Sequence, residues 1–363
     1  MSAQNPIAVT SKVNLVDLDD HDVPELARFV AAQSGRAVAE TLPHLNWLLL
    51  QNPFCHADGR LPLGCGLRSS DGELVGCILY LPQMFVFART PLLVLGSSCF
   101  YVDESHRGSG GALFLNFTHA ANQYLMFGNS ANAIAAQLWK ARGAIPIPNS
   151  AHELLGVMHW PPVIEELAAR GGVPKSVASA AGAAAFWWRY IGKLELRLDK
   201  ESELVRLTSP EEVMELPLSE PSNYLTAQRT EPYIRWRYFS DRDSSLALFA
   251  LRSRRTQKQI LVTLNERPRG HRGQIRSVCL LDVFPKPTPD ALEAIIAALT
   301  ETYRGRVDMI VLRNLDTECQ EKMLSAGFQR RSFESPNGWL LDRKRLLTAS
   351  NYYFVPADGD WII

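Results

Sequence analysis

The chain has 363 residues, 46% of them hydrophobic and 21% charged, and these values exclude a mainly disordered protein. Its 38 basic residues (Lys and Arg) equal its 38 acidic ones, so it lacks the basic excess with which nucleic-acid-binding proteins neutralise phosphates. The sequence contains no run of about 18 apolar residues, as a membrane span would require. We therefore expect a protein of about two domains with neither a nucleic-acid partner nor a membrane span.

The N-terminus and the cysteines bear on the cell compartment. The first residues, MSAQNPIAVTSK, hold no apolar segment of the kind that a signal peptide contains. The six cysteines show no CxxC spacing, and we interpret them as reduced, mostly buried thiols. A zinc site at Cys55, His56, Cys65 and Cys77 is the alternative, although the spacings of ten and twelve between the cysteines match no common ligand pattern. These features predict a cytoplasmic protein without a metal.

In chain order, the first half alternates strands and helices. A strand at 13–16 precedes acidic residues at 19–22, which begin a helix with apolar residues on one face. Further strands are predicted at 65–69, 74–81, 92–102 and 124–127, and further helices at 112–121 and 130–141. Residues 145–177 are expected to form an irregular excursion with a short helix at 163–170, followed by a helix at 178–189.

The second half repeats this order. The segment YIRWRYF at 233–239 echoes HLNWLLL at 44–50. Strands are predicted at 246–251, 259–264, 275–284 and 309–312, and helices at 289–302 and 317–326. This weak internal repeat of about 190 residues predicts two tandem domains, 1–197 and 198–363, each with a mixed central sheet flanked by helices. The predicted fold class is α/β, in the mixed α+β sense.

The strongest local signal for chemistry is the segment YVDESHRGSGGA at 101–112, where a strand ends, a glycine-rich turn follows and a helix begins. Amide groups at a helix start are unpaired, and the helix dipole adds about half a positive charge there. Gly108, Gly110 and Gly111 let the backbone approach a phosphate because they carry no Cβ atom. A P-loop would need Gly-Lys-Ser/Thr, and a dinucleotide fingerprint would follow the first strand of a parallel sheet. The segment therefore predicts a pyrophosphate site of another kind.

At this turn the sequence resembles the GNAT superfamily of acyl-CoA-dependent N-acyltransferases. The family signature, Arg/Gln-x-x-Gly-x-Gly/Ala, is matched in full by RGSGGA at 107–112, and the resemblance covers residues 13–143. It implies that these amides hold the pyrophosphate of acetyl-CoA or another acyl-CoA, while the preceding strand pairs with the pantetheine arm. The cofactor-binding residues that it implies are Phe100, Tyr101, Val102, Arg107, Gly108, Ser109, Gly110, Gly111, Ala112 and Asn132.

The second half lacks the glycine signature. At the equivalent place it has DVFPKPTPD at 282–290, whose prolines remove the N–H donors that would bind a phosphate. We therefore expect one cofactor site, and a C-terminal copy that is structural or shapes the acceptor cleft. The tandem layout and the ending NYYF…DGDW resemble bacterial tandem GNAT proteins.

Acyl transfer needs a neutral acceptor, a base and an acid for the leaving thiolate. Many family members use a Tyr in the last helix as that acid, but Trp139 stands at the matching place, and an indole cannot serve. The candidate catalytic residues are Ser98 and Cys99, on the strand that faces the thioester in the family, and Tyr124 as an acid. No His is adjacent to Cys99, so a buried small residue is the simpler interpretation of this thiol.

Three functions are compatible with the sequence. The first is an acyl-CoA-dependent N-acyltransferase, in which a deprotonated small amine or amino sugar attacks the CoA thioester directly. The missing acid motivates the second, a non-catalytic CoA-binding or scaffold protein. The doubled fold motivates the third, an aminoacyl-tRNA-dependent peptidyltransferase, which would not need the pyrophosphate turn. Because the turn is intact, we favour the first.

Overall fold

The structure is a computed structural model of the chain. It describes residues 13–55, 57, 59, 61–172, 194–196, 202–218, 223–240, 245–253, 259–270, 274–345, 347 and 352–358. The helix predicted at 178–189 and His56 of the alternative zinc site lie outside the described residues.

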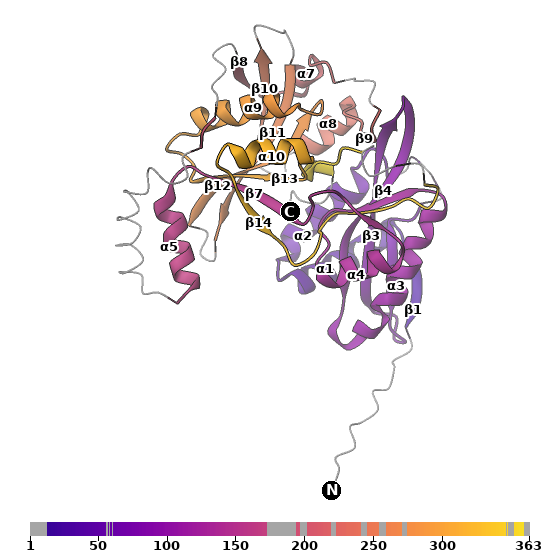
Figure 1. The fold of residues 1–363 in the computed structure, drawn as a ribbon. Coiled ribbons are helices and arrows are strands. Elements are labelled where there is room, and N and C mark those ends of the chain that lie inside the picture. The colour runs from indigo at the N-terminus through magenta and orange to yellow at the C-terminus, as the bar shows by residue number, and fades with distance from the viewer. Residues whose placement is uncertain are drawn as a thin grey trace.

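Two mixed sheets form the two lobes of the molecule (Figure 1). The first contains, in spatial order, β1 (Asn14–Leu18), β2 (Gly64–Arg68), β3 (Leu74–Phe87), β4 (Thr90–Val102), β5 (Leu125–Gly128), β15 (Trp339–Leu341) and β6 (Ile145–Pro146), and β9 (Thr226–Ala227) pairs with β3. The second contains β14 (Gln329–Ser332), β7 (His152–Val157), β13 (Met309–Arg313), β12 (Ile275–Phe284), β11 (Gln259–Arg269), β10 (Leu246–Ser253) and β8 (Ser202–Leu207). In each sheet one central pair is parallel, β4 with β5 and β12 with β13. The predicted mixed α/β fold of two tandem units is confirmed.

Helices cover both faces of each sheet. They are α1 (Val23–Ser34), α2 (Val38–Leu45), α3 (Gly110–Phe117), α4 (Ala133–Ala141), α5 (Trp160–Arg170), α7 (Pro210–Met214), α8 (Glu231–Tyr238), α9 (Pro289–Thr302) and α10 (Thr317–Ser325). Side chains of β3 alternate between the faces: Ile78 and Tyr80 pack with α3 and α4, whereas Leu79 and Leu81 pack with α1 and α2. In the second sheet, α9 and α10 cover one face and α5 covers part of the other.

Local sequence explains where several helices begin. The side chain of Asp316 accepts a hydrogen bond from the backbone amide of Cys319 in the first turn of α10. Ser209 and Glu212 form a reciprocal capping box at the start of α7. These caps satisfy amide groups that have no partner within the helix, so short helices can start at fixed residues.

The two halves exchange one strand each. The strand β7 comes from the first half but pairs with β13 and β14 in the second sheet, where Figure 1 shows it in magenta among orange strands. Conversely, β15 comes from the second half and pairs with β5 and β6 in the first sheet. The exchange is symmetric, because β7 lies beside β13 as β15 lies beside β5. The boundary at residue 197 stays a prediction.

A pair of tryptophans marks an approximate two-fold relation between the halves. The predicted repeat aligns Trp47 with Trp236, and the two indole rings stack with their centroids 5.1 Å apart. Each indole Nε1 donates a hydrogen bond of 2.8 Å to the backbone carbonyl of the other residue. Reciprocal contacts of this kind are what two-fold related surfaces produce.

Candidate active site

The first sheet splits where β4 and β5 part. The two strands pair in parallel only from Val94 to Gly96 on β4 and from Leu125 to Phe127 on β5. Beyond this point β4 continues to Val102, whereas β5 ends at Gly128. The edge of β4 that the resemblance assigns to the pantetheine arm therefore lies beyond its pairing with β5.

A β-bulge lies on β4 at this split. Ser98 pairs with Leu79 and Tyr101 with Cys77, so that Cys99 and Phe100 together face a single residue of β3. Cys99 adopts a left-handed conformation, with φ of 50°. Such a conformation costs on the order of 1–3 kcal/mol for a residue other than glycine, and strained residues and bulges concentrate at functional sites. The backbone is thus distorted at the residue that the sequence singled out.

The structure brings two of the three predicted catalytic residues together. The Ser98 hydroxyl donates to the Sγ of Cys99 across 3.5 Å, and Ser98 is buried while Cys99 is half-buried. The neighbouring Cys77 thiol donates to the carbonyl oxygen of Cys99 at 3.3 Å, and burial raises the pKa of Cys77 well above its usual value. Tyr124 directly precedes β5, at the end where this strand is paired with β4. It is separated from the split by the length of β5, about 13 Å.

The glycine-rich segment is more helical than the sequence indicated. Residues Glu104–Ser109 form a 3-10 helix that runs directly into α3, and the amide of Gly110 donates to the carbonyl of Arg107. Some of the backbone amides that could bind a phosphate therefore donate hydrogen bonds within the helix instead. Apart from chain neighbours, no described atom lies within 4 Å of where a Cβ would stand on Gly108 or Gly111. The backbone at these two glycines is open to a ligand.

Arg107 and Ser109 belong to this 3-10 helix, and Ala112 to the first turn of α3. The Arg107 side chain is 71% exposed and forms an ion pair of 3.4 Å with Glu104. It is therefore an exposed cation beside the open glycines.

Two residues of α4 have structural contacts. The side chain of Asn132 caps the helix by accepting a hydrogen bond of 2.9 Å from the amide of Ala135. Trp139 is buried in the core between α3, α4 and the sheet, where its ring meets that of Phe114 edge-on. A Cβ on Gly128 would lie 2.7 Å from the indole nitrogen of Trp139, so the two residues pack tightly. Trp139 is thus a core residue beneath β5.

Residues 352–358 return to the first sheet and lie beside β5, which the sequence analysis did not foresee. The ring of Phe354 packs against Phe127 of β5 and Phe85 of β3, with centroids 5.1 and 5.4 Å apart. Asn129, the residue after β5, is buried and donates to the carbonyl of Val355 at 3.3 Å. This segment therefore joins the site at the end of β5 where the sheet splits.

Asp358 is a buried carboxylate in this segment. Its Oδ2 accepts a hydrogen bond of 2.9 Å from the amide of Val355, and its Oδ1 lies 3.4 Å from Nη2 of Arg229. Burial raises the pKa of Asp358 to about 6; Arg229 opposes this rise, while the nearby Asp282 adds to it. The group is mostly ionised at pH 7 yet titrates close to neutrality.

Arg229 also joins the two sheets through Asp282. It follows β9, which pairs with β3, and its Nε and Nη2 atoms donate hydrogen bonds of 2.9 Å to the two carboxylate oxygens of Asp282 on β12. Both side chains are fully buried. The Tyr238 hydroxyl donates to the same carboxylate. Asp358 is therefore tied to an ion pair between the lobes.

Membrane spans and metal sites can be assessed for the described residues only. Within them, no helix combines the length and apolar character needed to cross a bilayer. Nor do three or more His, Cys, Asp or Glu side chains in these ranges meet as metal ligands would. Cys55, Cys65 and Cys77 are buried free thiols, which agrees with the interpretation of the sequence.

Comparison with known proteins identifies the fold. No family model and no curated protein matches the sequence. A GCN5-related N-acetyltransferase from Anabaena variabilis matches the structure with a TM-score of 0.57 and 9% identity, covering 91% of this chain and 72% of that one. One from Kribbella flavida matches with a TM-score of 0.53 and 14% identity, covering 93% and 73%. Saccharomyces cerevisiae N-myristoyltransferase with bound myristoyl-CoA matches with a TM-score of 0.51 and 12% identity, covering 94% and 85%.

These likenesses extend over both lobes rather than over one of them. At such low identities they show the fold alone. The chain shares the fold of these proteins over most of its length, and the resemblance stated from the sequence is confirmed at the level of the fold.

Proposed function

We propose that this protein is an acyltransferase that moves an acyl group from acyl-CoA to the amine of a small molecule or amino sugar. The observation that carries the proposal is the split between β4 and β5, which has the strained bulge at Cys99 on its edge. The open glycines Gly108 and Gly111 follow β4 in the sequence. The solved structures with this fold include N-acetyltransferases and an N-myristoyltransferase with bound myristoyl-CoA.

Each part of the site has a role in this proposal. The backbone of Phe100, Tyr101 and Val102 would pair with the amides of the pantetheine arm. The amides near Gly108 and Gly111, the exposed Arg107 and the dipole of α3 would hold the pyrophosphate. Ser98 and Cys99 would then lie near the thioester, as residues that shape the site rather than as nucleophiles. Tyr124 stays a candidate acid from the sequence, although it lies at the far end of β5.

We assign the role of general base to Asp358. With a pKa of about 6, its carboxylate is mostly ionised at pH 7, and because its side chain is fully buried it would receive the proton of the attacking amine through water rather than by direct contact. The neutral amine then attacks the thioester carbonyl, a C–N bond forms, the nitrogen loses its second proton to solvent, and the C–S bond to CoA breaks. The thiolate of CoA leaves and takes a proton from solvent. Asn129 and Val355 link this carboxylate to the end of β5.

The test places a negative charge where the pyrophosphate would bind. Gly108→Asp should weaken the binding of acetyl-CoA and longer acyl-CoAs about tenfold or more, measured by calorimetry, because the carboxylate repels the phosphates. Gly59→Asp is the matched control: a Cβ there meets no described atom within 4 Å, as at Gly108, but Gly59 lies outside the turn. Equal affinities of the wild type and Gly108→Asp would refute the assigned cofactor site.

Transfer itself needs a separate measurement. Release of free CoA thiol in the presence of a panel of amines should be detected with the wild type and fall about tenfold or more in Gly108→Asp when acyl-CoA is below its Kd. Binding of acyl-CoA with no transfer to any acceptor would favour the non-catalytic alternative.

A further inference from the structure

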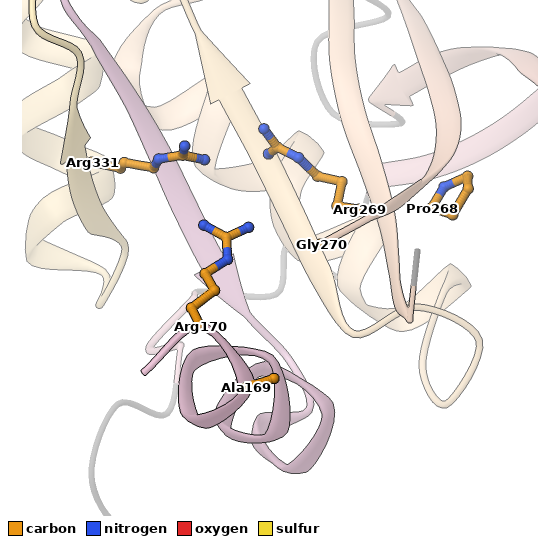
Figure 2. Close-up of a pocket in the computed structure, with 6 residues that line it drawn as sticks. All are labelled: Ala169, Arg170, Pro268, Arg269, Gly270 and Arg331. Atoms are coloured by element: carbon orange, nitrogen blue, oxygen red, sulfur yellow. The ribbon is translucent and has the colours of Figure 1, made fainter. Parts of the chain in front are cut away.

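An arginine-lined pocket of about 680 Å³ lies on the second lobe, away from the glycine-rich turn. It is bounded by the end of α5, the end of β11 and the strand β14 (Figure 2). Figure 2 shows the side chains of Arg170, Arg269 and Arg331 pointing toward the same region from three different elements. The residues that line the pocket are Ala169, Arg170, Pro268, Arg269, Gly270 and Arg331. None of them belongs to the proposed acyl-CoA site.

A buried glutamate holds most of these arginines. Glu153 on β7 is fully buried and forms ion pairs with Arg269 at 3.2 Å, with Arg313 at 2.7 Å and with Arg331 at 3.0 Å. Burial alone would raise the pKa of Glu153, but Arg269 and Arg313 outweigh it and hold the pKa below its usual value. The carboxylate therefore stays ionised and fixes the guanidinium groups in place.

The fourth arginine has its own partner. Arg170 at the end of α5 donates to Glu166 at 2.9 Å, and Glu166 is buried. Gly270 has φ of 92°, and a Cβ there would lie 2.8 Å from the Glu166 carboxylate. A glycine thus lets this carboxylate pack against the wall of the pocket.

The pocket keeps an excess of positive charge. Among the described side chains of this cluster, the three pocket arginines and the adjoining Arg313 meet two carboxylates, Glu153 and Glu166, which is a formal excess of two positive charges. Among the described residues, the Nη1 atom of Arg269 is buried and has no hydrogen-bond partner.

We propose that this pocket binds a small molecule through a phosphate group, which the guanidinium groups of Arg170, Arg269 and Arg331 contact. A phosphate monoester carries about −1.5 to −2 charges at pH 7, which matches the excess of two. Guanidinium groups bind phosphate oxygens in bidentate geometry, and these three come from a helix and two strands. A phosphate ion alone would not fill about 680 Å³, so the pocket has room for the organic part of the ligand.

The test measures binding of inorganic phosphate and pyrophosphate to the full chain by calorimetry at low salt. Arg331→Ala should raise the Kd of both probes about tenfold, because it removes one charge-assisted contact. This side chain is 49% exposed, and Glu153 keeps Arg269 and Arg313 as partners, so the fold should be retained. Arg235→Ala is the matched control: Arg235 is also 49% exposed and ion-paired, but it lies on α8. It should leave both Kd values unchanged.

Gly108→Asp separates this pocket from the proposed acyl-CoA site. Pyrophosphate binding that persists in Gly108→Asp and weakens in Arg331→Ala supports the arginine pocket, whether or not the chain binds acyl-CoA. Equal affinity of the wild type and Arg331→Ala would overturn the proposal. Loss of binding in Gly108→Asp alone would overturn it too, as would the absence of phosphate binding to the wild type at millimolar concentration.

Discussion

Replacing Arg229 by Met should destabilise the protein strongly, because this arginine is the cation shared by two buried carboxylates. It donates two hydrogen bonds of 2.9 Å to Asp282 and lies 3.4 Å from Asp358, and all three side chains are fully buried. Met keeps an unbranched apolar side chain but removes the charge. Removing one partner of a buried ion pair costs about 3–5 kcal/mol, since the remaining charge is uncompensated. That is a large part of a typical unfolding free energy of about 5–15 kcal/mol.

The stability that Arg229→Met loses should depend on pH in a definite direction. The pKa of Asp358 is about 6 in the folded protein and 3.8 for an unperturbed group, so its contribution to stability is complete below pH 3.8 and is lost as pH rises through 6. Removal of Arg229 takes away the charge that lowers this pKa, and the folded pKa should rise further. The variant should therefore differ less from the wild type at pH 5 than at pH 7.5. Urea unfolding followed by tryptophan fluorescence measures the difference at each pH.

Two further variants serve as controls. Arg235→Met removes an ion-paired arginine of α8 that is 49% exposed, and its unfolding midpoint should stay close to that of the wild type. The double variant Arg229→Met/Asp282→Asn removes one of the uncompensated carboxylates and should recover part of the loss. The reasoning would be refuted if Arg229→Met lost less than about 1 kcal/mol at pH 7.5, or if its deficit grew toward pH 5.

Two other outcomes can be measured on single variants. Gly128→Ala should lower the free energy of unfolding by about 1–3 kcal/mol, since its Cβ would lie 2.7 Å from the indole nitrogen of Trp139; an unchanged urea midpoint would contradict this packing. If Asp358 is the base, acyl transfer by the wild type should rise as pH passes through about 6, because the carboxylate must be ionised to accept a proton. Asp358→Asn should lower the rate about 10²–10⁴-fold and remove that inflection. If the variant keeps both the wild-type rate and the inflection, Asp358 is not the base.

The order of elements could be predicted because most elements carry their own local signal. The strand expected at 92–102 is Thr90–Val102, and the helix expected at 317–326 is Thr317–Ser325. The strand His152–Val157 was missed, since it lies in a segment that was expected to be irregular. Its hydrogen-bond partners belong to β13 and β14, in the other half of the chain. The local sequence gives no sign of a strand pairing between segments so far apart in the chain.

The site was predicted less completely than the fold. The turn and the strand before it were found because glycines and apolar runs have local signatures. Arg229, Asp282 and Asp358 come from three separate segments, and charged residues are normally exposed, so nothing in the sequence marked them as a buried cluster. The left-handed conformation of Cys99 was equally hidden, because few residues other than glycine adopt it and cysteine gives no sign of doing so.

The second lobe shows in structural terms why one cofactor site is the expected number. Its strands β12 and β13 pair in parallel from Ser277 to Cys279, and Leu281 is an extra residue on β12 just beyond, much like the bulge at Cys99. The place that corresponds to the first split is thus present. Here, however, the chain fills it: the Asp282 carboxylate is bound by Arg229, and the Tyr353 hydroxyl donates to the carbonyl of Val283 at 2.7 Å. In the second lobe, the place where β12 and β13 part therefore holds the C-terminal segment, and this segment carries Asp358 to the first lobe.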